Sequence, residues 1–245
     1  MNTYRAELHV HTVLSPCAEV EMIPPLIIQT ACDMGINLLA ITDHNCTRNI
    51  PAMMEAALGS GVSILPGMEL QTREEVHLLC IFDQPEQAFS FQQIIDPLLP
   101  DILNDPEHFG EQFIVDSTGD FLDSEPRLLL TSANISLDDA VIEVKALGGL
   151  AIPAHVDRKA YGLLNMLGFF PPDLNFDAVE ISKFITPEEI LKQHMGIQKY
   201  SIIQSGDAHR LNEILGKCYF ELQYPSINEI IKAFNHIENR SFKLL

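Results

Sequence analysis

Two histidines stand one residue apart near the start of the sequence, at the end of a strand-like run over residues 6–12. In an extended strand, residues i and i+2 point to the same face, so His9 and His11 can direct both imidazoles at one point. A metal ion is the simplest occupant of that point. For an isolated pair, a half-buried strand with two hydrogen-bonded histidines would be the better explanation. The rest of the sequence favours the metal.

Further metal-capable side chains recur at the ends of apolar segments. They are Asp43 and His44 after residues 36–42, Glu69 after 62–66, His155 after 150–154, Asp207 and His209 within 201–209, and His77 at the start of 76–82. Independent histidines would have no reason to gather at such places. Imidazole and carboxylate ligands together suit Zn, Mn or Fe. Six histidines with two or three acids exceed the three or four protein ligands of one catalytic ion. The sequence therefore predicts two or three divalent metal ions.

The segments that carry these residues alternate with predicted helices. Residues 22–35 have prolines at positions 24 and 25, where a helix can begin, and end at Gly35, where one can stop, and residues 51–58 form a second helix. Ser136, Thr186 and Ser226 open later helices with capping sequences. Seven strands in rotation with helices predict an α/β fold, as a parallel barrel rather than an open sheet. In such a barrel all strand C-termini open on one rim, where active sites are built.

Residues 83–126 interrupt this rotation with an acidic insertion. They contain eleven acidic residues and no lysine or arginine. Within them, residues 112–122 predict a small hairpin that turns at Thr118 and Gly119. A solvated elaboration of one helical crossover is the favoured interpretation, and a binding arm or a lid beside the strand ends is the alternative. Because no repeat or linker is visible, we predict a single domain over residues 1–245.

The composition limits the partners that we expect. The formal net charge is −19, from 34 acidic and 15 basic residues, and such a field disfavours nucleic acid. No apolar run approaches the roughly 20 residues of a membrane span, and the first residues do not resemble a leader peptide. We therefore expect a cytoplasmic protein with no membrane partner, and free thiols at its five scattered cysteines. The sequence does not indicate the oligomeric state.

Taken in order, the motifs resemble those of the polymerase and histidinol phosphatase (PHP) superfamily. The matching residues are His9-x-His11-Thr12, Thr42-Asp43-His44, Gly67-x-Glu69, His77 before an apolar strand, Ala154-His155 and Gly206-Asp207-Ala208-His209. Any one of these motifs is weak, but all of them in order, from about residue 5 to residue 216, are strong. The resemblance implies a distorted TIM-like (β/α)7 barrel with the acidic insertion after its fourth strand. It also implies a trinuclear metal centre and phosphoesterase activity.

The resemblance further implies a role for each residue. The first metal ion would be held by His9, His11, Glu69 and Asp207. Glu69 would bridge to a second ion, which His77 and His155 also hold. The third ion would be held by His44 and His209. In many members the third site also takes a histidine eight residues after the first histidine of the opening motif, and here that position is Cys17. Cys17 is either a soft thiolate ligand or an ordinary buried thiol. Asp43 is expected to orient His44 or a neighbouring ligand.

We expect the protein to hydrolyse a small phosphorylated metabolite of the nucleotide or sugar monophosphate class. A water shared between closely spaced cations would lose its proton and attack phosphorus as a metal-activated hydroxide. The residues expected around the reacting centre are Asp43, Glu69, Asp207 and His209. Candidates to bind the substrate phosphate are Arg158, Arg210 and Lys183, each of which could instead form a structural ion pair.

Two other functions remain open. A nuclease acting on oligonucleotides would use the same chemistry, although the acidic composition counts against it. A non-catalytic metal-binding protein with a regulatory role would explain Cys17 and the acidic insertion. No polymerase module follows the last predicted helix in this sequence, so we expect a stand-alone enzyme.

Overall fold

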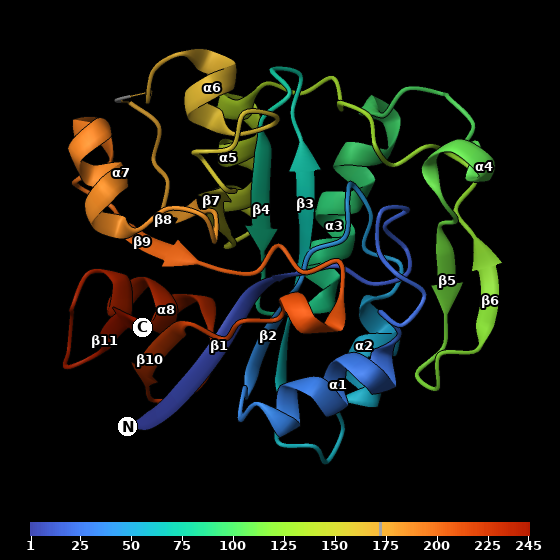
Figure 1. Ribbon diagram of the computed structural model, residues 1–245, viewed down its shortest axis with the longest axis horizontal. Helices are drawn as coiled ribbons and strands as arrows, with labels where there is room; N and C mark the ends of the chain where they lie inside the picture. The colour runs from blue at the N-terminus through green and yellow to red at the C-terminus, as the bar shows by residue number, and fades with distance from the viewer. Residues whose placement is uncertain (172) are drawn as a thin grey trace.

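The structure is a computed structural model that describes residues 1–171 and 173–245. Its centre is a curled sheet of seven strands in the order β11–β10–β1–β2–β3–β4–β7 (Figure 1), and two smaller sheets pair β8 with β9 and β5 with β6. The strands are β1 (Asn2–Val10), β2 (Leu38–Ile41), β3 (Ser63–Gln71), β4 (His77–Ile81), β5 (Phe113–Val115), β6 (Phe121–Ser124), β7 (Leu150–Pro153), β8 (Ala178–Ile181), β9 (Ser201–Gln204), β10 (Cys218–Leu222) and β11 (Ser241–Leu244).

The chain forms the helices α1 (Pro24–Asp33), α2 (Ile50–Ala56), α3 (Pro85–Ile95), α4 (Pro106–Phe109), α5 (Leu137–Ala146), α6 (Leu163–Leu167), α7 (Pro187–Gln193) and α8 (Ile227–Phe234), with 3₁₀ turns at Asp96–Leu98, Met195–Ile197 and Leu211–Glu213. The helices α1, α2, α5, α7 and α8 begin within two residues of the predicted starts, whereas α3, α4 and α6 are not predicted. The side chains of Ser136, Thr186 and Ser226 accept backbone N–H groups at the starts of α5, α7 and α8, which confirms the predicted caps. Over the described residues, no helix is long and apolar enough to cross a membrane.

The sheet is mixed, and the expectation of an all-parallel barrel is wrong in this respect. β1, β2 and β3 are parallel, but β4 runs antiparallel to both β3 and β7 (Figure 1). The reason is the connection between β3 and β4, because residues 72–76 are too few for the crossover that a parallel pair needs. A consequence is that the first residue of β4, not its last, lies at the edge where β1, β2 and β3 end.

Main-chain bonds continue the curl beyond β7. Val156 donates its N–H to the carbonyl of Glu180 at 2.9 Å, and Asp177 donates to Ala151 at 3.2 Å, which joins β8 to β7. After β9, Ala208 forms a parallel bridge with Val10 of β1. The β8–β9 pair therefore lies between β7 and β1, and brings the segment after β9 to the end of β1.

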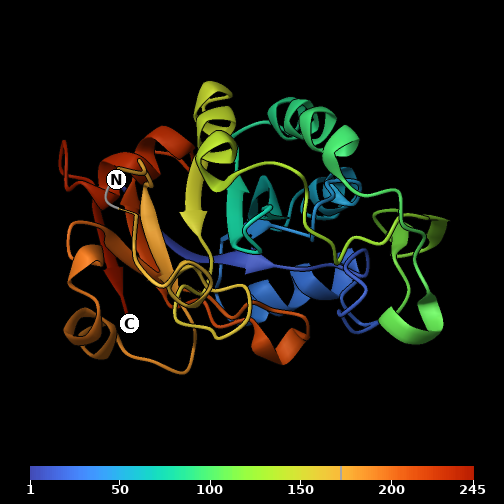
Figure 2. The same ribbon diagram turned by 90° about the horizontal axis from the view of Figure 1, so that it is seen from above.

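The core lies on both faces of the sheet. On the outer face, α3 and α5 pack on β4 and β7 through side chains such as Phe91 and Val141 (Figure 2). Inside the curl, Leu8, Ala40 and Ile152 belong to one buried cluster that also contains the apolar face of α8. Full burial of each such Val, Leu, Ile or Phe side chain contributes about 1.5–3 kcal/mol, so the curl is a packed core with its polar residues confined to one end.

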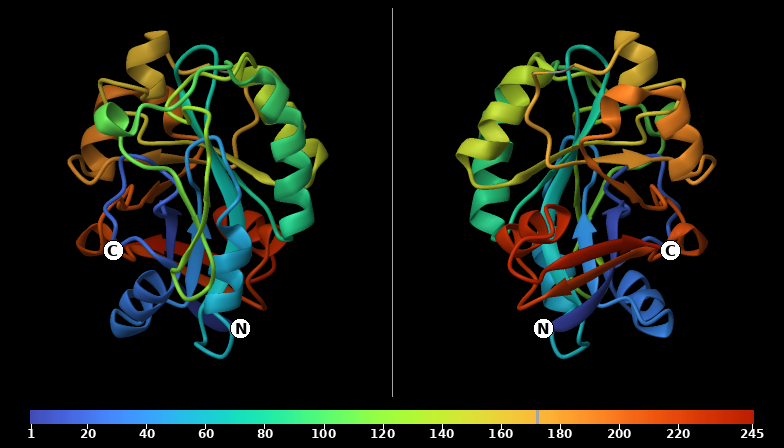
Figure 3. Two further views of the ribbon diagram at one scale, coloured as in Figure 1. Left: turned by 90° about the vertical axis from the view of Figure 1, so that its right-hand side faces the viewer. Right: turned by 90° about the vertical axis from the view of Figure 1, so that its left-hand side faces the viewer.

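The acidic insertion contains the predicted hairpin. β5 and β6 pair antiparallel, and the turn between them has Gly119 at φ 87° with Asp116 Oδ1 accepting the N–H groups of Thr118 and Asp120. The insertion is only partly solvated, because α3 inside it is a crossover helix that buries Phe91 completely. The hairpin lies on the side of the molecule away from β8 and β9 (Figures 1 and 3). There it supports the loop after β1, because Phe113 donates its N–H to the carbonyl of Val13 at 2.9 Å.

Candidate metal centre

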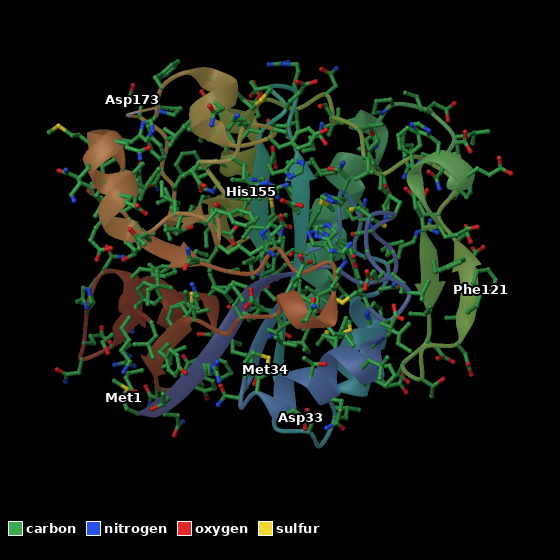
Figure 4. The ribbon with its side chains drawn as sticks, viewed as in Figure 1. Met1, Asp33, Met34, Phe121, His155 and Asp173 are labelled. Atoms are coloured by element: carbon green, nitrogen blue, oxygen red, sulfur yellow. The ribbon has the colours of Figure 1, made fainter. Side chains whose placement is uncertain are left out.

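The predicted ligands converge at one end of the curl. His9 Nε2 lies 3.1 Å from His11 Nε2, 3.2 Å from Glu69 Oε1 and 3.3 Å from Asp207 Oδ1. Figure 4 labels His155, which shares this cluster, near the middle of the molecule. Three sets of side chains have ligand atoms that all lie within 4.8 Å of one another: His9 with His11, Glu69 and Asp207; His44 with Glu69 and His77; and His11 with His44 and His209. These overlapping buried sets indicate a multinuclear metal site.

Hydrogen bonds on the outer edges of the rings direct His9 and His11 into the cluster. The Nδ1–H of His9 donates to Glu180 Oε2 at 2.9 Å. The Ser15 hydroxyl donates to Asp43 at 2.7 Å, so its oxygen accepts the Nδ1–H of His11 at 2.9 Å. Both Nε2 atoms therefore present lone pairs to each other across 3.1 Å. Two lone pairs this close repel unless a cation or a proton lies between them.

Other polar atoms in the cluster are buried without a partner. Asp207 Oδ1 and His155 Nδ1 have no hydrogen-bond partner among the described residues. Buried polar groups are normally hydrogen-bonded, and an uncompensated carboxylate oxygen is costly. A bound cation would compensate the Asp207 oxygen and the facing imidazoles together. The donor set of imidazole nitrogens and carboxylate oxygens thus fits a group of divalent transition-metal ions.

Glu69 stands at the centre of the cluster. Its Oε1 lies 2.8 Å from His77 Nδ1 and 3.1 Å from His155 Nε2, and its Oε2 lies 2.9 Å from His44 Nδ1. Burial alone would raise the pKa of Glu69, but the charges of His77, His9 and His44 hold it well below its usual range. The carboxylate is therefore ionised and can face more than one cation. His77 reaches it because the antiparallel β3–β4 pairing places His77 opposite Gln71, two residues beyond Glu69.

The backbone is strained where two of the predicted ligands follow their strands. His155 has φ 29° and Asp207 has φ 49°, in the left-handed region that non-glycine residues rarely adopt. Each such conformation costs about 1–3 kcal/mol and is held by its surroundings. Gly206 precedes Asp207 because a Cβ there would lie 1.8 Å from the carbonyl oxygen of Glu213. These turns direct the side chains of His155 and Asp207 into the cluster instead of along the chain.

Cys17 lies beside the third set. Its thiol interacts with His44 and His209, whose charges and hydrogen bonds outweigh the opposing effect of burial and lower the pKa of Cys17 to about 6. The rings of His11 and His209 stack with their centroids 4.0 Å apart. The three-histidine set that the structure forms here contains His11, which the resemblance places in the first site only, and Cys17 is outside it.

Asp43 is fully inside the protein but belongs to none of the three ligand sets. It accepts the backbone N–H and the hydroxyl of Thr12 at 2.7 and 2.8 Å, besides the hydroxyl of Ser15. Because Ser15 also accepts the N–H of His44 at 3.2 Å, Asp43 supports His11 and His44 through one serine.

The three candidate phosphate-binding cations line a cavity of about 490 Å³ that also exposes the histidine cluster. Each is held by a carboxylate: Arg158 pairs with Asp207, Lys183 with Glu213 at 3.0 Å, and Arg210 with Glu19 at 2.6 Å. The residues that line the cavity lie outside the acidic insertion, so the lining gives no support to the interpretation of the insertion as a lid over this site.

Sequence reasoning missed two buried acids that support the cluster. Glu180 accepts the Nδ1–H of His9 and the backbone N–H of His155. Glu7 accepts the N–H groups of Gly206, Leu215 and Gly216 at 2.6–2.8 Å, which ties β1 to the segment that carries Asp207. Burial raises the pKa of Glu7 to about 7, against the effect of these N–H groups. A signal was present in the sequence, because a lone acid inside an apolar strand is almost never buried without a partner.

Comparison with known proteins agrees with this geometry. The sequence model of the PHP domain family matches residues 7–96, which contain six of the predicted ligands. The 5'-3' exoribonuclease Rnm of Salmonella typhimurium is 35% identical over 78 residues, which are 30% of this chain and 26% of that protein. The chain therefore spans about a quarter of the length of this curated relative.

Solved structures extend the similarity to the whole fold. The lesion-specific endonuclease PfuEndoQ of Pyrococcus furiosus superposes with a TM-score of 0.71 and 20% identity, over 98% of this chain and 58% of that one. A protein of Bifidobacterium adolescentis described as a metal-dependent phosphoesterase superposes with a TM-score of 0.56 and 18% identity, over 84% and 87% of the two chains. With the family match over residues 7–96 and the buried histidine–carboxylate sets, these likenesses identify the chain as a PHP domain protein with the phosphoesterase-like fold of that superfamily.

Proposed function

We propose that this protein is a metal-dependent phosphoester hydrolase with two or three divalent ions, Zn, Mn or Fe, in the histidine cluster. The observation that carries the proposal is the pair of Nε2 atoms of His9 and His11, which face each other at 3.1 Å and both lie 3.3 Å from Asp207 Oδ1. The predicted first set of four ligands is one of the sets that the fold brings within 4.8 Å. Such an arrangement is unfavourable unless a proton or a cation lies between the two nitrogen atoms, and the nitrogen and oxygen atoms that meet there suit a divalent metal ion.

The distorted TIM-like (β/α)7 barrel is the description of the fold that we favour. It is supported by the bonds that insert β8 and β9 between β7 and β1. In this description the ligands come from the ends of several different strands, as in other barrel enzymes.

The residues of the chain would divide the work of hydrolysis. When bound, the ions supply Lewis acidity toward the phosphoryl oxygens and activate a water molecule. Glu69, ionised and within 3.4 Å of five imidazoles, would hold neighbouring ions together. Glu180 and Ser15 would keep His9 and His11 in the Nδ1–H tautomer, which leaves the lone pair of each Nε2 free to bind a metal ion. Arg158, with its guanidinium at the cavity wall, would hold a phosphate oxygen by paired hydrogen bonds.

A small phosphorylated metabolite is the substrate class that we favour. A cavity of about 490 Å³ lies in the range of small-molecule sites, and the net charge of −19 opposes a long polyanion. A nuclease acting on oligonucleotides is the second candidate. The similarity to an exoribonuclease and to a lesion-specific endonuclease favours it, although those activities belong to the relatives.

Hydrolysis of a panel of sugar phosphates, nucleoside monophosphates and short 5'-phosphorylated oligonucleotides tests the proposal, with release of phosphate measured for all of them and release of nucleotides also measured for the oligonucleotides. The panel is run with added Zn, Mn or Fe and after treatment with a chelator. We expect metal-dependent release that the His9→Ala variant lacks. Release that neither the chelator nor the substitution reduces would contradict the metal site. Metal binding without any hydrolysis would favour a regulatory protein instead.

A further inference from the structure

One aromatic side chain at the cavity has no role in the packing of the protein. Phe184 follows β8 and lines the same cavity as the histidine cluster, yet it is 83% exposed. The next residue, Ile185, packs on the outer core cluster. The loop therefore buries its aliphatic side chain and presents its aromatic ring to solvent. Burial energy does not explain this choice, because an exposed Phe forgoes the contribution that a buried one makes.

The loop that carries Phe184 is firmly held. Gln204 Nε2 donates to the carbonyls of Ser182 and Ile185 at 2.7 and 2.9 Å. Ser182 donates its N–H to Asp157 at 2.7 Å, and its hydroxyl oxygen accepts the N–H of Phe184 at 3.3 Å. Bonds on both sides of the residue fix the backbone, so the exposed position of the ring is built into the loop. A loop whose backbone is already ordered loses little entropy when a ligand packs on its side chain.

The ring is also close to the cationic part of the cavity. Lys183 Nζ lies 5.8 Å from the centroid of the Phe184 ring and 3.0 Å from Glu213 Oε1. The other oxygen of Glu213 accepts the backbone N–H of His209 at 3.1 Å, so one carboxylate links this loop to the metal cluster. If a ligand places its phosphate at the cluster, the rest of the ligand would have the positive charge of Lys183 and the flat apolar face of Phe184 within reach.

We propose that Phe184 is a stacking platform for the nucleobase of a nucleoside phosphate whose phosphate lies at the metal cluster. The proposal rests on the proposed function and assigns its substrate class, a nucleotide in preference to a sugar phosphate. A nucleobase fits because every base offers a flat face to an aromatic ring. Leu130, which is partly exposed and lines the same cavity, adds apolar surface to the cavity wall. The nucleotide can be free or can be the terminal residue of a short chain.

Steady-state kinetics on matched substrates tests this specificity. Adenosine 5'-monophosphate and ribose 5-phosphate carry the same phosphoester and differ in the base. We expect Phe184→Ala to lower the ratio of kcat/KM for the nucleotide over that for the sugar phosphate by about 10-fold, mostly through KM. Phe121→Ala is the control, because Phe121 is 62% exposed on β6 at the far side of the molecule (Figure 4). An unchanged ratio in Phe184→Ala would overturn the proposal, as would an equal fall in Phe121→Ala.

A second measurement does not depend on turnover. The chain has no tryptophan, so Phe184→Trp places the sole indole of the protein at the proposed platform. We expect adenosine 5'-monophosphate to quench its fluorescence in the metal-loaded protein, and ribose 5-phosphate at the same concentration to leave it unchanged. Equal responses to both ligands would overturn the proposal. If quenching is seen but no ester is hydrolysed, the platform stands and the proposed hydrolase activity fails. Comparison with a 5'-phosphorylated dinucleotide then shows whether a free or a chain-terminal nucleotide binds better.

Discussion

Replacement of Glu180 by glutamine would test how the metal cluster is held. The carboxylate is fully buried, and its Oε2 accepts both the Nδ1–H of His9 at 2.9 Å and the backbone N–H of His155 at 3.0 Å. Glu180→Gln keeps the size of the side chain and one acceptor oxygen but removes its negative charge. We therefore expect the variant to fold, with His9 less basic and less firmly oriented.

The magnitude follows from the two oxygens of Glu180. The amide oxygen can replace Oε2, which leaves the amide NH₂ where Oε1 now lies, and Oε1 has no partner among the described residues. A buried donor without an acceptor costs about 1–3 kcal/mol of stability. Loss of the carboxylate behind a metal-binding histidine weakens metal affinity by about 10–100-fold. The metal-free variant should thus melt at a lower temperature, and the loaded variant should also lose metal at a lower chelator concentration.

Competition with a chromophoric chelator near neutral pH measures the affinity, and thermal unfolding measures the stability. Glu55→Gln is the matched control, because Glu55 is exposed on α2 and belongs to none of the three ligand sets. The reasoning would be refuted if Glu180→Gln bound metal within about twofold of the unsubstituted protein while His9→Ala lost it.

Three further predictions concern the same cluster. Ser15→Ala should weaken metal affinity by about 10-fold or more, because the Nδ1–H of His11 and the carboxylate of Asp43 lose their shared partner; the chelator assay measures this. Metal affinity should rise between about pH 6 and pH 8, because a metal ion must displace protons from the imidazoles. The sign follows from His9: burial alone would lower its pKa, but the charges of Glu180, Glu69 and Asp207 raise it well above its usual range, so protons compete even near neutrality. Calorimetric titration in buffers of different pH checks this. Cys17, whose pKa is lowered to about 6 in the metal-free protein, should react with iodoacetamide at neutral pH before the buried Cys46 and Cys218, whose pKa values burial raises. Peptide mass spectrometry identifies the modified thiol, and protection by added metal would favour Cys17 as a ligand.

Local signals in the sequence were sufficient for much of the fold. Prolines at the first turn of α1 and α2, and the caps at Ser136 and Thr186, fix helix starts through local geometry alone. The nearly continuous apolar runs of β2 and β7 belong to strands buried on both faces. The convergence of His9, His44 and Asp207 was also predictable, because it needs only that their strands end at a common edge.

What escaped prediction depends on partners distant in the sequence. β10 and β11 extend the sheet only because β10 pairs antiparallel with β1, so the chain reverses onto a strand more than two hundred residues earlier. The predicted direction of β4 is wrong because the alternation of strands with helices does not continue across the short connection of residues 72–76. The supporting role of Glu7 was invisible for a similar reason, since its three N–H donors lie in residues 206–216.

Metal binding and folding of this protein should be linked. The fold holds His155 and Asp207 in left-handed conformations, and among the described residues His155 Nδ1 and Asp207 Oδ1 are buried without a hydrogen-bond partner; each of these features opposes folding. A cation that satisfies those atoms binds only the folded chain and stabilises it, by about 4 kcal/mol at a free metal concentration 1,000 times the dissociation constant. The strain at Asp207 is tolerable because Glu7 of β1 accepts N–H groups from the segment that carries Asp207, and these bonds do not depend on the metal. The ion would thus add stability to a geometry that contacts within the chain, such as those of Glu7, also hold.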